Sequence, residues 1–168
     1  EGVAKAKGEM FSGLADDGIA VINGDDDFAP LWHELAGERQ RLGFARHARA
    51  DADVFASDIE LEANSSRFTL HTPTGAADVV LPLAGAHNIS NALAAAAAAS
   101  AIDLDADLIA RSLAAMVGVG GRMTIIVGRH GARLIDDSYN ANPGSLAAAL
   151  GWLAQQRGTR WAALGDMA

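Results

Sequence analysis

The 168-residue chain contains no cysteine, and this absence excludes several classes of protein. Without thiols the chain can form no disulfide scaffold, no thiolate zinc site and no cysteine nucleophile. Aromatic residues are also scarce, at 5% of the sequence, although half of all residues are hydrophobic. We therefore expect an ordered globular protein whose core consists largely of alanine, valine, leucine and isoleucine.

Basic residues are in the minority, with 13 Lys+Arg against 21 Asp+Glu and a formal net charge of −8. This balance argues against a general nucleic-acid-binding protein, because neutralising phosphates requires clustered lysine and arginine. The sequence also lacks an apolar run of about 18 residues, the length that a membrane-spanning helix needs. Its alanine-rich run at 92–99 is too short. We expect neither nucleic-acid binding nor insertion into a membrane.

Short apolar runs that resemble strands alternate with segments of helical composition, and this order favours the α/β class. We predict part of a mostly parallel sheet flanked by helices, with an antiparallel β meander in the middle of the chain. The predicted strands are 19–23, 39–46, 54–61, 67–72, 78–83, 123–127, 133–136 and 160–164, and the predicted helices are 2–14, 28–35, 88–101, 106–116 and 143–156. Asp27 and Asp105 are the predicted N-caps of two of these helices.

The segment Gly85–Asn91 joins an apolar strand to a predicted helix. Asn88 and Asn91 are three residues apart, so they share one face of that helix. Their carboxamides and the free backbone N–H groups at a helix N-terminus could bind the edge of a purine or a phosphate. The simpler interpretation is that His87 and Asn88 cap the helix.

A second polar segment follows the predicted strand 133–136 and contains the adjacent carboxylates Asp136 and Asp137. In α/β proteins, ligands bind at the carboxyl ends of strands, and alternation directs one of two adjacent side chains toward such a site. A carboxylate here would suit ribose hydroxyls or a hydrated Mg²⁺ ion. A turn that caps the next helix would explain only one or two of the polar residues, so we favour a binding role.

The glycines of Gly120-Gly121-Arg122 would let the backbone approach a ligand, and the arginine could hold a phosphate. A flexible loop with a surface arginine is the simpler explanation. The sequence lacks the Gly-x-x-x-x-Gly-Lys-Ser/Thr motif that cradles nucleotide phosphates, and its histidines show no metal-ligand spacing. We therefore assign no catalytic residue and no metal ligand within this sequence.

In combination, Gly85–Leu93, Gly121-Arg122, Asp136–Pro143 and Leu164–Met167 follow the order seen in Mur ligases, and the chain resembles that family over nearly its whole length. The segments Ser138–Pro143 and Gly165–Met167 look most like the members that add D-alanyl-D-alanine. The resemblance implies that 1–137 is part of a central ATP-binding domain. It implies that 138–168 is a hinge with the first helix and strand of a Rossmann-like C-terminal domain. The P-loop and the Mg²⁺ ligands of the family are expected upstream of this sequence.

The activity that the resemblance implies is a cytoplasmic step of peptidoglycan synthesis. ATP would phosphorylate the terminal carboxylate of a UDP-N-acetylmuramoyl-tripeptide, and the amine of D-Ala-D-Ala would then displace phosphate. By position, the implied adenine pocket contains His87, Asn88 and Asn91, with Arg122 near the phosphates or ribose and Asp137 on the ribose hydroxyls. The implied hinge contains Tyr139, Asn140 and Asn142.

Alternatives remain open at this point. The chain could belong to a diaminopimelate- or lysine-adding Mur ligase, to a folylpolyglutamate synthase, or to a non-catalytic nucleotide-binding or interaction module. We expect residues 1–168 alone to be inactive as a ligase. The whole interpretation requires that Asp137 and the helix start near Asn88 lie on opposite sides of one nucleoside site.

Overall fold

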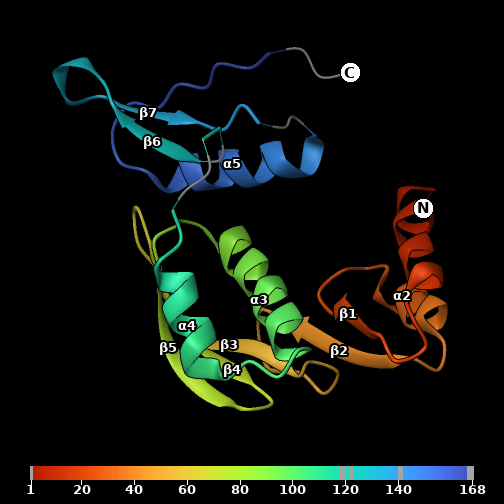
Figure 1. Ribbon diagram of the computed structural model, residues 1–168. Helices are drawn as coiled ribbons and strands as arrows, with labels where there is room; N and C mark the ends of the chain where they lie inside the picture. The colour runs from red at the N-terminus through yellow and green to blue at the C-terminus, as the bar shows by residue number, and fades with distance from the viewer. Residues whose placement is uncertain (1, 118–119, 122, 140–141, 166–168) are drawn as a thin grey trace.

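The computed structural model describes residues 2–117, 120–121, 123–139 and 142–165. It consists of a larger unit built on a five-stranded sheet and a smaller unit built on a two-stranded ribbon (Figure 1). The larger unit contains α1 (Gly2–Gly8), η1 (Glu9–Gly13), β1 (Ile19–Asn23), α2 (Ala29–Ala36), β2 (Gln40–Ala45), β3 (Val54–Leu61), β4 (Ser66–Thr72), β5 (Gly75–Leu81), α3 (Ala86–Ser100) and α4 (Ala106–Ala114). The smaller unit contains β6 (Thr124–Val127), η2 (Arg129–Gly131), β7 (Arg133–Asp136) and α5 (Pro143–Gln155).

The strands of the larger sheet lie in the order of the sequence, from β1 to β5. The pairings β1–β2 and β2–β3 are parallel, and the pairings β3–β4 and β4–β5 are antiparallel. The structure thus confirms the α/β class and the predicted meander. The meander continues the parallel strands within a single mixed sheet, because β3 belongs to both parts.

Helices α3 and α4 pack on the sheet and close the main core. Helix α3 contributes Ile89 and Leu93, which are fully buried, together with the small side chains of Ala92, Ala96 and Ala97. Alanines allow the helix backbone to come close to the strands, so the core needs few large residues. This packing confirms the aliphatic, alanine-rich core expected from the composition.

A second, smaller core joins the N-terminal helices to β1 and includes Phe11, Ile22 and Ala36. The indole Nε1 of Trp32 donates a hydrogen bond to the carbonyl of Ala4 at 3.3 Å, which ties α2 to α1. The helix predicted over 2–14 is in fact the short helix α1 followed by the 3-10 helix η1. None of the described helices has the length and apolar character that crossing a membrane requires.

The predicted cap at Asp27 is wrong. The backbone N–H of Phe28 donates instead to the carboxylate of Asp26, at 2.9 Å, and α2 has no side-chain cap. Each of the three consecutive aspartates could make such a local bond. In an Asx turn the side chain accepts the N–H of the residue two positions on, so the N–H of Phe28 bonds to Asp26. The cap predicted at Asp105 is confirmed, since its carboxylate accepts the N–H of Leu108 at 2.8 Å.

The hairpin predicted around Gly128–Gly131 is confirmed, because β6 and β7 pair antiparallel across it. The strand predicted over 160–164 is wrong. This segment has no regular secondary structure, and the Trp161 side chain is 87% exposed. A short apolar segment becomes a strand only where a neighbouring strand supplies hydrogen bonds, and no described strand lies beside it.

Candidate functional site

The start of α3, the end of β7 and the first turns of α5 meet at one cavity of about 350 Å³. Helix α3 contributes His87, Asn88 and Asn91 to its wall, and Asp137, directly after β7, lies on the same wall. The structure therefore brings together Asn88 and Asp137, which are 49 positions apart in the sequence. We call this the smaller cavity.

Gly85 sets the direction in which α3 begins. Its φ of +93° belongs to a region that residues with a side chain rarely adopt. The ring of His87 folds back over it, and a Cβ atom added at Gly85 would lie only 2.8 Å from His87 Cε1. A glycine at this position thus allows the imidazole to occupy the wall of the smaller cavity.

Asn88 and His87 do not cap α3, so the simpler interpretation of this segment is wrong. No side chain accepts a hydrogen bond from the first turn of the helix. The amide Nδ2 of Asn88 donates to the carbonyl of Ala84 at 2.8 Å, and its Oδ1 accepts from Asn91 Nδ2 at 3.5 Å. The two carboxamides are therefore held in a fixed orientation at the cavity.

His87 is half-buried between polar neighbours. Burial lowers the pKa of its imidazole below the ordinary value of 6.5, and the negative charge of Asp137 opposes that shift only in part. At neutral pH the ring is thus mainly uncharged. A neutral imidazole presents one hydrogen-bond donor and one acceptor, as a purine edge requires.

The two adjacent aspartates have separate surroundings, as strand alternation predicts. Oδ1 of Asp136 accepts the backbone N–H of Ser138 at 3.1 Å, and hydrogen bonds from the Ser138 side chain and then its backbone lower the pKa of Asp136. Asp137 lines the smaller cavity, and its Oδ1 accepts the backbone N–H of Met123 at 3.2 Å. Asp137 is the carboxylate available to a ligand there.

Gly121 places the adjoining loop. Its φ is +76°, and its carbonyl accepts the backbone N–H of Tyr139 at 2.9 Å. Tyr139 lines the smaller cavity with its side chain 64% exposed. The predicted residues Arg122 and Asn140 lie outside the described residues.

Asn142 has a structural role in addition to its place on the cavity wall. Its Oδ1 accepts the N–H of Ser145 at 2.9 Å, and Ser145 Oγ accepts the N–H of Asn142 at 3.3 Å, which forms a capping box at the start of α5. The part of the wall formed by α5 was not predicted from the sequence. Ser145, Ala148 and Ala149 follow the i, i+3, i+4 spacing of one helix face, which is the signal that could have revealed it.

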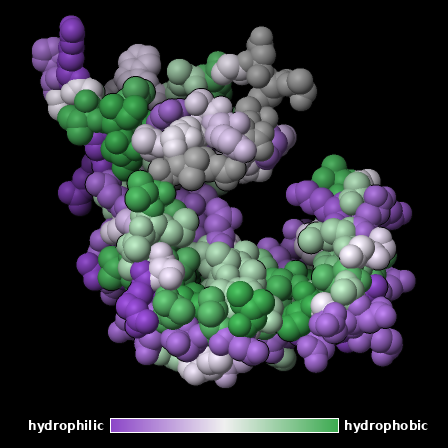
Figure 2. Space-filling view, viewed as in Figure 1, coloured by the Kyte–Doolittle hydropathy of each residue, from purple (hydrophilic) through white to green (hydrophobic). Residues whose placement is uncertain are grey.

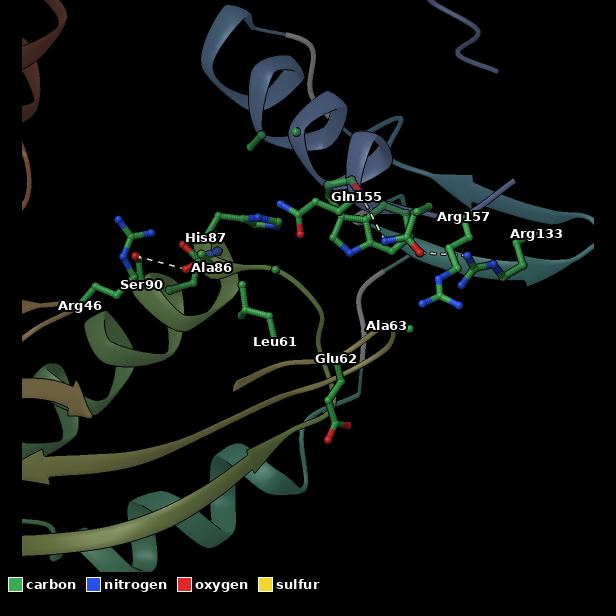
Figure 3. A pocket seen from close by; sticks show the side chains of 16 residues that line it. Arg46, Leu61, Glu62, Ala63, Ala86, His87, Ser90, Arg133, Gln155 and Arg157 are labelled. Carbon is green, nitrogen blue, oxygen red and sulfur yellow. Dashed lines mark hydrogen bonds between the residues drawn. The ribbon is translucent and has the colours of Figure 1, made fainter. Parts of the chain in front are cut away.

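A larger cavity of about 820 Å³ adjoins the smaller one and shares His87, Asn91 and Ala148 with it (Figure 3). Its walls come from the end of β2, the start of α3, the loop after β3 and the C-terminal half of α5. The space-filling view shows the molecule hollowed between the smaller unit and the N-terminal helices (Figure 2). Among the described residues, no three His, Asp or Glu side chains are grouped to hold a metal ion.

Two family models match the chain. Residues 1–99 match the Mur ligase middle domain, and residues 121–168 match the Mur ligase, glutamate ligase domain. The chain is 46% identical over 167 residues to the UDP-N-acetylmuramoyl-tripeptide–D-alanyl-D-alanine ligase of Escherichia coli strain K12. That alignment covers 99% of this chain and 37% of the relative, so the chain spans little more than a third of the length of the protein it matches.

Solved structures agree with the sequence comparison. The chain resembles a crystal structure of MurF from Acinetobacter baumannii with a TM-score of 0.87 and 39% identity, covering 95% of this chain and 34% of that one. It also resembles the UDP-N-acetylmuramoylalanyl-D-glutamyl-2,6-diaminopimelate–D-alanyl-D-alanyl ligase of the same organism. There the TM-score is 0.82 and the identity 40%, with the same shares of the two chains covered.

Proposed function

Because the chain belongs to the Mur ligase family, we propose that it is part of an ATP-dependent ligase that joins D-Ala-D-Ala to a UDP-N-acetylmuramoyl-tripeptide. The reaction would be a cytoplasmic step of peptidoglycan synthesis. The observation that carries the proposal is the smaller cavity, where Asn88, Asn91 and Asp137 converge from separate elements. The 46% identity to a D-Ala-D-Ala-adding ligase over almost the whole chain supports this branch over the other amide-forming ligases.

The smaller cavity suits the adenosine part of ATP. Its volume of about 350 Å³ falls within the range of small-molecule pockets, near the lower end. The neutral imidazole of His87 and the carboxamides of Asn88 and Asn91 would recognise the adenine edge. The carboxylate of Asp137, fixed by the Met123 N–H, would accept hydrogen bonds from the ribose hydroxyls.

A carboxylate does not react with an amine directly, because its oxygen is a poor leaving group. The proposed reaction therefore begins with phosphorylation of that oxygen. Transfer of the γ-phosphoryl group of ATP to the tripeptide carboxylate forms an acyl phosphate and releases ADP. The amine of D-Ala-D-Ala then attacks the acyl carbon, and the tetrahedral intermediate expels phosphate to leave the amide. The described residues would hold the nucleoside and fix its direction, which is the positioning part of catalysis.

The described residues do not supply a Mg²⁺ site, because no group of acidic or histidine side chains is suitably placed among them. We therefore assign no step through Mg²⁺ to them and propose that its ligands belong to other parts of the protein. We also propose that residues 1–168 alone do not catalyse ligation, since their sequence contains no P-loop motif for the β- and γ-phosphates.

We propose that the domain boundary lies after Asp137, so that 138–168 begins the C-terminal domain. In this arrangement Tyr139, Asn140 and Asn142 belong to the connection, and Arg122 approaches the nucleotide phosphates or ribose. The smaller cavity, which draws its wall from both α3 and α5, supports a nucleotide site that both domains complete. The peptide substrate would carry several carboxylates, like those of the D-glutamyl and 2,6-diaminopimelate residues in the name of the Acinetobacter ligase.

The test is ATP binding by the complete ligase that carries this sequence, measured by calorimetry. Asp137→Asn should weaken binding about tenfold, because it replaces a charged hydrogen-bond acceptor with a neutral one. Asp136→Asn is the matched control, since Asp136 bonds to Ser138 and does not line the cavity. Equal ATP affinities for the wild type and Asp137→Asn would contradict the nucleotide site.

A further inference from the structure

The larger cavity concentrates positive charge in a chain whose net charge is −8. Three arginines line it: Arg46 after the end of β2, Arg133 at the start of β7 and Arg157 after α5. Arg133 Nη2 donates to Oε1 of Gln156 at 2.9 Å, which holds its guanidinium beside the residue that precedes Arg157. None of these three arginines is among the residues that the sequence predicts to bind the nucleotide.

Among the described residues, no acidic side chain forms an ion pair with these three arginines. The one acidic residue of the wall, Glu62, bonds to Arg67 at 2.9 Å, and its carboxylate is directed away from Arg133 and Arg157 in Figure 3. Hydrogen bonds from Ser65 and then Arg67 lower the pKa of Glu62, so it is ionised and already paired. A cavity lined by charge of one sign attracts ligands of the opposite sign.

The arginines lie toward two ends of the larger cavity, whose wall also includes apolar side chains. In Figure 3, Arg46 lies on one side of His87, and Arg133 and Arg157 lie on the other side, beyond Gln155. Leu61 and the buried ring of Trp152 belong to the wall. This layout fits a ligand with separated anionic groups joined by a partly apolar chain better than it fits contiguous phosphates.

We propose that the larger cavity binds the acidic peptide of the substrate, with Arg46 holding one of its carboxylates and Arg133 and Arg157 holding another. A guanidinium matches a carboxylate with two parallel hydrogen bonds, and three of them discriminate strongly against an uncharged peptide. The shared wall at His87 and Asn91 places this peptide next to the nucleotide. The inference rests on the proposed function, since it names the residues that select its peptide substrate.

The experiment is steady-state kinetics of the complete ligase with each substrate varied in turn. In Arg46→Gln, and in the double variant Arg133→Gln/Arg157→Gln, the KM for the UDP-N-acetylmuramoyl-tripeptide should rise roughly tenfold. The KM for ATP and the KM for D-Ala-D-Ala should each stay within about twofold of the wild type. Arg157→Lys should have an intermediate effect, because lysine keeps the charge and loses the planar fork.

The matched control is Arg129→Gln, which removes an exposed positive charge from η2, away from the cavity. It should leave all three KM values unchanged. A rise confined to the KM for ATP would assign the arginines to nucleotide phosphates and overturn the proposal, as would a rise confined to D-Ala-D-Ala. Unchanged KM values in the arginine variants would also overturn it. If Asp137→Asn still weakened ATP binding in that case, the proposed function would stand without this inference.

Discussion

The two units of the molecule bury their apolar residues to very different extents. In the larger unit, Leu93 of α3 and Leu70 of β4 are fully buried between helices and sheet. In the smaller unit, Val127 and Leu134 of the ribbon are mostly exposed. Among its described residues, the one buried hydrophobic side chain is that of Trp152 in α5. Figure 2 shows a patch of hydrophobic surface at the upper left of the molecule, within the smaller unit. The larger unit therefore has a closed core, and the proposed binding region lies where the two units meet.

The largest loss of stability should come from shortening a side chain in the closed core of the larger unit. Leu93→Ala leaves a void beneath α3 and should lower the free energy of unfolding by about 3 kcal/mol. Leu134→Ala removes the same atoms from a side chain that is 60% exposed, and should change it by less than about 0.5 kcal/mol. Urea denaturation of both variants measures the difference. Equal losses would show that the ribbon is packed as tightly as the core.

The next effect concerns the glycine between β5 and α3. Gly85→Ala should cost about 1–3 kcal/mol, because alanine is strained at a φ of +93° and its Cβ would displace the ring of His87. It should also weaken ATP binding, since His87 lines the smaller cavity.

Gly131→Ala is the control for that change. Gly131 has a similar φ of +78°, but no atom lies within 4 Å of an added Cβ. Its cost should therefore reflect backbone strain alone, with ATP affinity unchanged. If the two variants bound ATP equally well, the position of the His87 ring would not matter for the nucleotide.

The caps of α4 and α5 sharpen the comparison between the units. Asp105→Ala and Asn142→Ala each remove one cap and should each cost about 1 kcal/mol. Loss of the Asp105 cap should reduce hydrogen-exchange protection across the larger unit, because α4 packs on β4 and β5. Loss of the Asn142 cap should reduce protection in α5 alone. Loss of protection throughout the chain in Asn142→Ala would show that the units unfold together.

The smallest effect is a pH dependence from His87. The folded state lowers the pKa of His87, mainly by burial, so protonation favours the unfolded chain. The stability held by the neutral ring is fully present above the unfolded value of about 6.5, and is lost as the pH falls below it toward the lower pKa of the folded state. His87→Gln should flatten this part of the pH–stability curve. A histidine titration by NMR that placed the pKa of His87 above 6.5 would contradict the assignment.

Elements whose residues carry their own signal could be predicted from the sequence. The strand over Val54–Leu61 has its predicted bounds, because Val54 and Ala56 alternate with less buried neighbours. The alanine run of α3 predicts a helix whatever its tertiary contacts, because alanine has the highest helix propensity. By contrast, β5 begins at Gly75 rather than at 78, because pairing of Thr72 with Gly75 extends the hairpin beyond the apolar run. The partner strand β4 thus determines where β5 begins. Segment 160–164 has no such partner among the described residues, and it forms no strand.

The candidate site could be predicted only in part. Asp137 and Asn88 carried a signal because polar side chains follow an apolar strand or begin a helix, although β7 belongs to the two-stranded ribbon and not to the larger sheet. The face of α5 that completes the smaller cavity did not, since Ser145, Ala148 and Ala149 are ordinary helix residues. The arginines of the larger cavity are distant from one another in the sequence, and they line one cavity only because α5 lies across it from α3.

The most direct measurement of the central claim is a crystal structure of the complete ligase with ADP bound. We predict that the ribose hydroxyls lie within hydrogen-bond distance of the Asp137 carboxylate, with the adenine edge against His87, Asn88 and Asn91. A nucleoside bound elsewhere, with Asp137 free of contact to it, would contradict the account.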